Sequence, residues 1–136
     1  MTPGSVFFDR SFSFHDNESG EKLFVVLGWS NMSAIVAKTT SRQHERGLTF
    51  GCQPKDRFHN FYLPQYSCYF KKCTWVCLDE FYEINAGVAL QKRLNGIINP
   101  VCNLIDDQIK AIQLCALESD DISGIHESII KASLIK

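Results

Sequence analysis

Basic, imidazole and acidic side chains gather at two places in this chain of 136 residues. Arg42, His44 and Arg46 crowd one polar loop, where guanidinium groups can hold phosphate oxygens and the imidazole can titrate near neutral pH. Asp79 and Glu80 can include a general base, but adjacent strand residues point to opposite faces, so at most one of them faces any cleft. The basic cluster can equally be a solvated polar loop, and both interpretations stay open.

The six cysteines are even in number, which suggests disulfides in a short secreted chain. The first residues lack the basic stretch and apolar run of a secretory signal, so we expect a cytoplasmic protein with free thiols. Cys68, Cys73 and Cys77, with His59 upstream, invite a zinc interpretation, but their spacing misses the paired Cys-x2-4-Cys pattern. We therefore expect no metal and no other cofactor.

Composition places the chain among ordinary globular proteins, with 45% hydrophobic and 21% charged residues. Its length predicts a single domain over residues 1–136. The net charge of -1 creates no overall field that attracts nucleic acid, so any such site must be a local patch. No apolar run is long enough to span a bilayer, and we expect no membrane partner.

Alternating and β-branched patterns predict strands in the first hundred residues, and a period near three and a half predicts helices after them. Residues 48–69 show no clean period. Pro100 is expected to end a last short strand that includes residues 96–98, because proline lacks the ladder donor. These patterns predict an α+β, mainly β fold, with a β-rich part at 1–100 and a helical tail at 101–136. The expected strands lie at 5–14, 23–27, 33–40 and 73–78, a turn lies at 85–87, and the expected helix caps are Asn103 and the group 119–121.

Four segments match, in order, the motifs of one known family. Residues 3–8 (PGSVFF) resemble an opening Gly-(Asp/Ser)-hydrophobic strand, and residues 20–27 (GEKLFVVL) resemble Gly-x-Arg-Pro followed by a hydrophobic strand. Residues 35–41 (IVAKTTS) resemble Ile-Val-Ala-x-(Ile/Leu)-Thr-(Ser/Thr), and residues 75–82 (WVCLDEFY) resemble Val-x-Leu-(Asp/Glu)-Gln-x-Arg. With the helix from Asn103, the chain resembles the MazF/PemK family of toxins from toxin–antitoxin modules over nearly its whole length.

The resemblance implies an SH3-like curled antiparallel sheet or small barrel with C-terminal amphipathic helices. Typical members are homodimeric, metal-independent endoribonucleases that cut single-stranded RNA, inhibit growth and are neutralised by a cognate antitoxin protein. Cleavage of this kind uses the 2′-hydroxyl as nucleophile and needs a base, donors for the phosphorane oxygens and an acid. The implied catalytic residues are Lys22, Thr40 and Glu80, and the implied RNA-binding residues are Arg42, His44, Arg46 and Tyr82.

Two departures from the family pattern define the alternatives. The arginine before the second strand falls on Lys22 with no proline after it, and the arginine of the last motif falls on Tyr82, which can instead be a packed aromatic. The first alternative is a catalytically silent SH3-like binding or regulatory module, and the second is an unrelated β-barrel with no nucleic-acid role. Several aromatic residues can stack on RNA bases or fill a core and a dimer face: Phe58, Phe61, Tyr62, Tyr66 and Tyr69.

Overall fold

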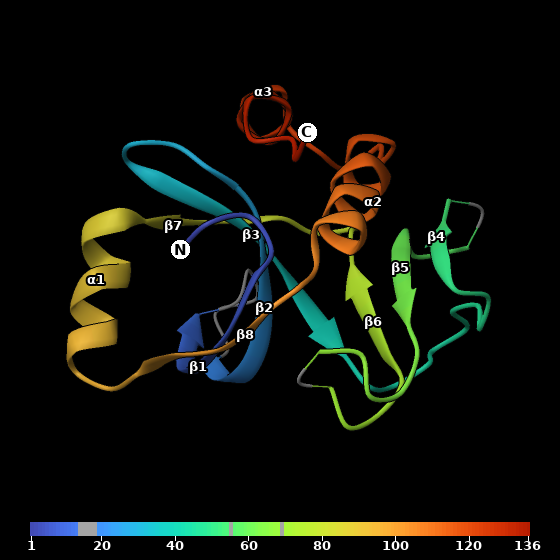
Figure 1. Ribbon diagram of the computed structural model, residues 1–136, viewed down its shortest axis with the longest axis horizontal. Coiled ribbons are helices and arrows are strands. Elements are labelled where there is room, and N and C mark those ends of the chain that lie inside the picture. Colours follow the sequence, from blue (N-terminus) through green and yellow to red (C-terminus); the bar gives the residue numbers. More distant parts are fainter. Residues whose placement is uncertain (14–18, 55, 69) are drawn as a thin grey trace.

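The computed structural model describes residues 1–13, 19–54, 56–68 and 70–136 (Figure 1). The predicted strand end at Phe14, the loop residues 15–18 and Tyr69 lie outside the described residues. Within the described part the chain forms eight strands and three helices, in the order β1 (Ser5–Ser13), β2 (Ser19–Trp29), β3 (Ser33–Thr40), β4 (Gly51–Gln53), β5 (Asn60–Leu63), β6 (Thr74–Cys77), β7 (Tyr82–Asn85), α1 (Ala86–Leu94), β8 (Ile98–Asn103), α2 (Asp106–Leu117) and α3 (Gly124–Ala132).

The strands form one antiparallel sheet that curls into a half-barrel. Its order is β4-β5-β6-β3-β2-β1-β8, and β7 pairs with β3 outside this path. β3 is the branch point: residues 33–36 pair with β7, whereas Thr39 and Thr40 pair with β6. The class is therefore α+β and mainly β, as the sequence predicts, and β3 carries its predicted bounds.

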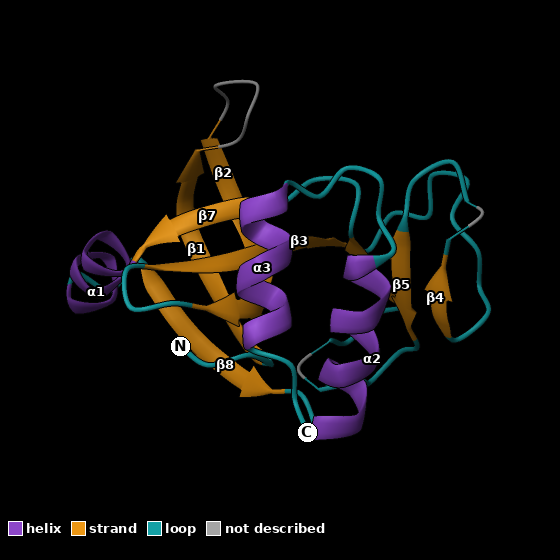
Figure 2. Ribbon diagram, turned by 90° about the horizontal axis from the view of Figure 1, so that it is seen from above, coloured by secondary structure: helices purple, strands orange, loops and turns teal. Residues whose placement is uncertain are grey.

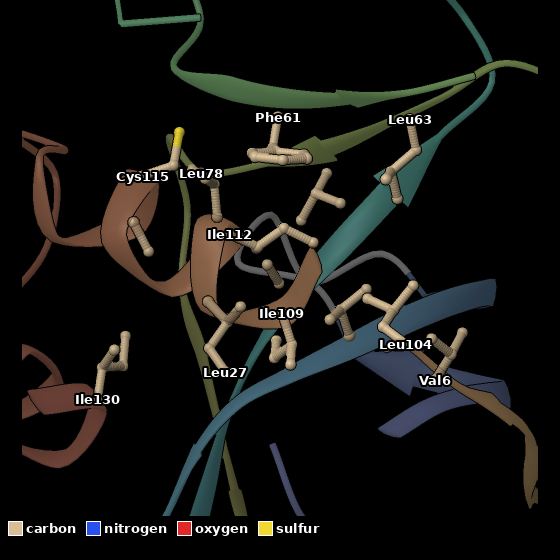
Figure 3. Close-up of a cluster of buried hydrophobic side chains, with 14 of the residues drawn as sticks. Val6, Leu27, Phe61, Leu63, Leu78, Leu104, Ile109, Ile112, Cys115 and Ile130 are labelled. Atoms are coloured by element: carbon tan, nitrogen blue, oxygen red, sulfur yellow. The ribbon is translucent and has the colours of Figure 1, made fainter. Parts of the chain in front are cut away.

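Apolar side chains cover both faces of the sheet. One cluster lies between the sheet and the two last helices and contains Leu27, Ile35 and Ile112, all completely buried (Figure 3). The second cluster, with Phe24 and Val36, lies on the other face, and α1 closes it. Figure 2 shows α2 and α3 side by side over one face, with α1 at the opposite end. Full burial of each such side chain contributes about 1.5–3 kcal/mol.

Helix α1 was not predicted, because the sequence at 85–87 was interpreted only as a turn. The Asn85 side chain in fact caps the helix, since its Oδ1 accepts hydrogen bonds from the Gly87 and Val88 N–H groups at 2.8 and 3.2 Å. Val88 and Leu90 on the helix are exposed, and Ala89 is its buried residue, so the helix carries no broad apolar stripe. The periodicity that reveals other helices is therefore weak here.

Pro100 does not end the last strand, contrary to the prediction. β8 runs through it to Asn103 and pairs with β1 alone, with a register irregularity between Val6 and Phe7. An edge strand has one side without ladder partners, so a proline is tolerated there. Asn103 is consequently a strand residue, and its Oδ1 accepts a hydrogen bond from the Ser5 hydroxyl at 3.2 Å.

The predicted helix caps were also wrong. α2 has Ile105 at its N-cap, with no side-chain cap, and Asp106 and Asp107 in its first turn favour the positive end of the helix. α3 is capped by Ser123, whose hydroxyl accepts from the His126 N–H at 3.2 Å. Ser119 instead donates its hydroxyl hydrogen to the Leu78 carbonyl at 2.6 Å, so it ties α2's end to the sheet.

Four cysteines are bonded, which corrects the expectation of free thiols. Cys52 on β4 is joined to Cys115 on α2, and Cys68 is joined to Cys102 on β8. Spacing could not predict these pairs, because each bond joins residues far apart in the sequence. Among the described helices, none has the length and apolar character needed to cross a membrane.

Candidate functional site

An open pocket of about 360 Å³ brings together three lysines and several hydroxyl groups at one end of the half-barrel. Lys22 and Thr40, two residues chosen from the sequence, both line it. Lys71 and Lys72 line it as well, although the sequence analysis did not select them. The pocket is also lined by Phe8, Leu23, Thr39, Ser41, Phe70 and Thr74.

The pairing of β2 with β3 explains why Lys22 and Thr40 meet. Phe24 lies opposite Lys38 in the antiparallel register, and two further residues along each strand bring Lys22 level with Thr40. The Thr39 hydroxyl donates to the Leu23 carbonyl at 2.9 Å, which fixes the two strands together at the pocket. The Thr40 Oγ1 accepts from the Arg42 N–H at 3.2 Å, and its own hydrogen can still donate to a ligand.

Lys22 lies in a strongly cationic environment. Burial is the main cause that lowers its pKa, and the positive charges of Lys38, Arg42 and Arg46 lower the pKa further, whereas Cys77 acts in the opposite direction. An anion bound beside Lys22 would offset both the cost of burying the lysine charge and the repulsion among the neighbouring cations. The electrostatics therefore favour a bound phosphate or carboxylate group.

The loop that carries Lys71 and Lys72 is held at three points. Phe70 is 4% exposed and belongs to the cluster under α2, so the loop has an apolar anchor. The Thr74 hydroxyl donates to the Lys72 carbonyl at 2.9 Å. The Cys68–Cys102 disulfide joins the start of the loop to β8. The two exposed lysines therefore project from a fixed wall of the pocket.

The basic side chains of the loop after β3 do not form one cluster. Arg46 is 9% exposed, and its Nη1 donates to the carbonyls of Arg42 and Gln43, each at 3.3 Å. The guanidinium also lies 5.2 Å from the ring centre of Phe58. Arg46 therefore supports the loop from inside. His44 lines a separate hollow with Arg46, and its φ of 41° shows a left-handed backbone.

Glu80 and Tyr82 are bonded to each other and do not line the pocket, and Tyr82 lines a separate hollow with Phe12 and Lys92. The Tyr82 hydroxyl donates to Glu80 Oε2 at 2.5 Å, and Glu80 Oε1 lies 3.7 Å from Lys38 Nζ. The ring of Tyr82 is 4% exposed and packs edge-on against Phe12 at 5.0 Å. Tyr82 is therefore a packed aromatic whose face is unavailable for base stacking. Glu80 is linked to the positively charged side chains around Lys22 through its ion pair with Lys38.

Asp79 is the other candidate for a general base that the sequence offers beside Glu80. Burial is the main cause that raises its pKa, and the charge of Glu80 raises it too, whereas Arg46 and Lys38 act against the rise. Its Oδ1 is buried and has no hydrogen-bond partner among the described residues. Asp79 therefore binds its proton more strongly than an ordinary aspartate.

Of the aromatic residues selected from the sequence, Phe61 and Tyr62 lie in the core, whereas Phe58 is partly buried and Tyr69 lies outside the described residues. Phe61 and Tyr62 are 2% and 8% exposed, and Tyr62 packs against Trp75 with ring centres 5.4 Å apart. Tyr66 is 76% exposed. The suggested zinc donors do not converge, because Cys68 is bonded to Cys102 and Cys73 accepts the Tyr62 hydroxyl at 3.1 Å.

Comparison with known proteins adds no relative. No protein-family model matches the chain, and no curated protein matches it in sequence. The resemblance to MazF/PemK toxins therefore rests on the four sequence segments.

Proposed function

We propose that the protein binds single-stranded RNA in the pocket between Lys22 and Lys72 and cleaves it without a metal ion. The observation that carries this proposal is the convergence of Lys22, Thr40, Lys71 and Lys72 on one open pocket in a chain of net charge -1. A local concentration of cations is what phosphate binding needs when the whole protein offers no attractive field.

Two of the groups that attack by a 2′-hydroxyl requires line the pocket, and the proposed base, Glu80, lies outside its lining. Lys22 supplies a positive charge for the non-bridging phosphate oxygens, and the Thr40 hydroxyl supplies a hydrogen-bond donor. Glu80 is the proposed base that takes the proton of the 2′-hydroxyl. To do so, its carboxylate must first give up the hydrogen bond from the Tyr82 hydroxyl and accept one from the substrate. The new bond joins the 2′-oxygen to phosphorus, the bond to the 5′-oxygen breaks, and a proton from the pocket or solvent completes the 5′-hydroxyl.

The proposed class is a MazF/PemK-like toxin with an SH3-like fold. The curled antiparallel sheet supports this identity, together with the family-like segments that contribute Lys22, Thr40 and Glu80. Within this proposal the protein acts as a cytoplasmic homodimer that inhibits growth, and an antitoxin protein neutralises it by occupying the same cationic pocket.

A second candidate is an RNA-binding module of the same fold that does not cleave. The state of Glu80 favours it, because the carboxylate contacts both Lys38 and Tyr82 and does not line the pocket. A base held in this way is less able to take a proton from a 2′-hydroxyl. Phosphate binding by the lysines is common to both candidates.

Incubation of purified protein with a long RNA in EDTA, followed by mapping of the new ends, tests the enzyme. We expect discrete cuts with 5′-hydroxyl ends, and a loss of about 100-fold or more in rate for Lys22→Ala and for Thr40→Val. Lys110→Ala, an exposed lysine on α2, is the matched control and keeps the wild-type rate. RNA that binds in the pocket but stays intact supports the second candidate, and RNA that does not bind overturns both.

A further inference from the structure

Outside the lining of the pocket, two cysteines and a histidine from three different segments meet at the edge of the sheet. We propose that the reduced chain binds Zn²⁺ through Cys52, His59 and Cys115. The potential ligand atoms of these three residues all lie within 4.8 Å of one another. The set does not overlap the lysine pocket, so the inference is independent of RNA binding.

The distances from the His59 nitrogen to the two sulfurs suit a tetrahedral ion. His59 Nε2 lies 3.5 Å from Cys115 Sγ and 4.0 Å from Cys52 Sγ. Zinc–sulfur and zinc–nitrogen bonds at the tetrahedral angle place a thiolate sulfur about 3.5 Å from an imidazole nitrogen. Once the disulfide is reduced, the two sulfurs must separate to about 3.8 Å, the spacing of two thiolates on one tetrahedral zinc ion. This separation lets one ion contact all three residues.

The surrounding structure fixes the backbone of each ligand. Cys52 is on β4, Cys115 is on α2 at one end of the apolar cluster in Figure 3, and His59 directly precedes β5. The His59 carbonyl accepts from the Leu78 N–H at 2.8 Å. His59 Nε2 now lies 2.6 Å from the Cys115 carbonyl oxygen, and in the zinc form it turns from that oxygen to the ion.

Three protein ligands leave one position of a tetrahedral zinc ion open. Glu118 lies close to the proposed ligands, with Oε2 3.9 Å from Cys52 Sγ, and it is exposed. Its carboxylate or a water molecule can complete the coordination. The donor set of two thiolates and one imidazole selects zinc over the hard cations magnesium and calcium, which prefer oxygen ligands.

The same two cysteines form a disulfide, so bond formation and zinc binding exclude each other. In the reduced state each thiol loses a proton as it binds the ion. A disulfide oxidant takes two electrons from the two thiolates, so that the Cys52–Cys115 bond forms, the oxidant leaves as two thiols with two protons from solvent, and Zn²⁺ is released. Oxidation therefore replaces the bound metal ion by a covalent bond between β4 and α2.

The test uses the full chain, reduced with a phosphine that does not compete for zinc, and then given Zn²⁺ alone and desalted. We expect one zinc per chain by atomic emission, and with Co²⁺ the absorption bands of a tetrahedral thiolate site. His59→Gln removes a ligand but leaves both cysteines, so it is the decisive variant, and we expect it to lose stoichiometric zinc. Its fold is checked in the oxidised form, in which two free thiols, those of Cys73 and Cys77, should remain.

Cys68→Ser is the matched control, because it removes a cysteine of the other disulfide and leaves the three ligands intact. This variant should bind one zinc when reduced. Oxidised wild type should bind none at this site. The proposal is overturned if reduced wild type retains no zinc, if His59→Gln retains as much as wild type, or if the oxidised chain binds as much as the reduced one.

Discussion

Lys92 Nζ on α1 lies 2.6 Å from Asp9 Oδ2 on β1, and the Asp9 side chain is completely buried. Asp9 Oδ1 accepts a second hydrogen bond from the Ser11 N–H at 2.9 Å. Asp9 is also the register partner of Lys22 across β1 and β2. The carboxylate next to the candidate site is thus bonded to the helix, which joins α1 to the strand that borders the pocket.

Replacing Lys92 by Met should lower the free energy of unfolding by about 3 kcal/mol, because it leaves a buried carboxylate without its counter-charge. Chemical denaturation at pH 7 measures the loss. Lys131→Met is the matched control, since Lys131 pairs with Glu127 at 2.7 Å on the exposed face of α3. That change should cost no more than about 0.5 kcal/mol. Adding Asp9→Asn to Lys92→Met should recover part of the loss, and equal effects of the two lysine variants would contradict the prediction.

Gly28→Ala should destabilise the protein by about 1–3 kcal/mol, because α3 crosses β2 at this glycine. A Cβ there would lie 3.1 Å from the Ile130 Cα, and backbone cannot move aside as a flexible side chain can. Gly124→Ala, at the start of α3, meets no atom within 4 Å and should raise stability through helix propensity. Thermal unfolding of both variants measures the difference, and a loss of stability in Gly124→Ala equal to that in Gly28→Ala would refute the packing argument.

The strands buried on both faces were predictable from the sequence, whereas the elements fixed by tertiary contacts were not. β3 has its predicted bounds because its β-branched residues, such as Ile35 and Val36, face two cores. β4 has three half-buried residues, too few to show a period. Helix α1 depends on the Asn85 cap and the Lys92 ion pair, and neither gives an apolar stripe.

The candidate site was predictable only where neighbouring strands supply it. The motifs around Lys22 and Thr40 are consecutive strands, so their meeting follows from one hairpin register. Lys71 and Lys72 reach the pocket through a loop held by Phe70 and by the Cys68–Cys102 bond, which joins residues distant in sequence. No local sequence pattern predicts such a contact. The sequence analysis grouped His59 with Cys68, Cys73 and Cys77 and not with Cys52 and Cys115, because the fold and not the spacing brings the last two cysteines to His59.

Asp79→Asn should raise stability at neutral pH by less than about 1 kcal/mol, because it removes a charge that the fold partly desolvates and that solvent still partly screens. The folded state raises the pKa of Asp79 above its ordinary value near 3.8. The folded protein therefore binds the proton more tightly than the unfolded chain. The stabilisation from this proton is complete below the ordinary pKa and is lost as pH rises through the raised pKa.

Denaturant unfolding of wild type and Asp79→Asn from pH 3 to pH 8 gives the measurement. The two curves should coincide at the acidic end and separate in favour of the variant as pH rises. Glu45→Gln is the control, since Glu45 is exposed and pairs with the exposed Arg57 at 3.4 Å. A gap between wild type and Asp79→Asn that does not change with pH would show that charge is not the cause.

The double variant Lys71→Ala with Lys72→Ala should reduce the salt dependence of RNA binding more than alanine substitution of another pair of surface lysines does. Each phosphate contact on a single strand contributes about 0.7 to the slope of log K against log salt, so two lost contacts lower the slope by about 1.4. The measurement is fluorescence anisotropy with a short homopolymeric RNA, from low to moderate salt. Lys110→Ala with Lys136→Ala changes the net charge equally on exposed residues far along the chain from the pocket loop, and should leave the slope unchanged. Equal changes in both double variants would mean that RNA responds to net charge, and the pocket would then not be the binding site.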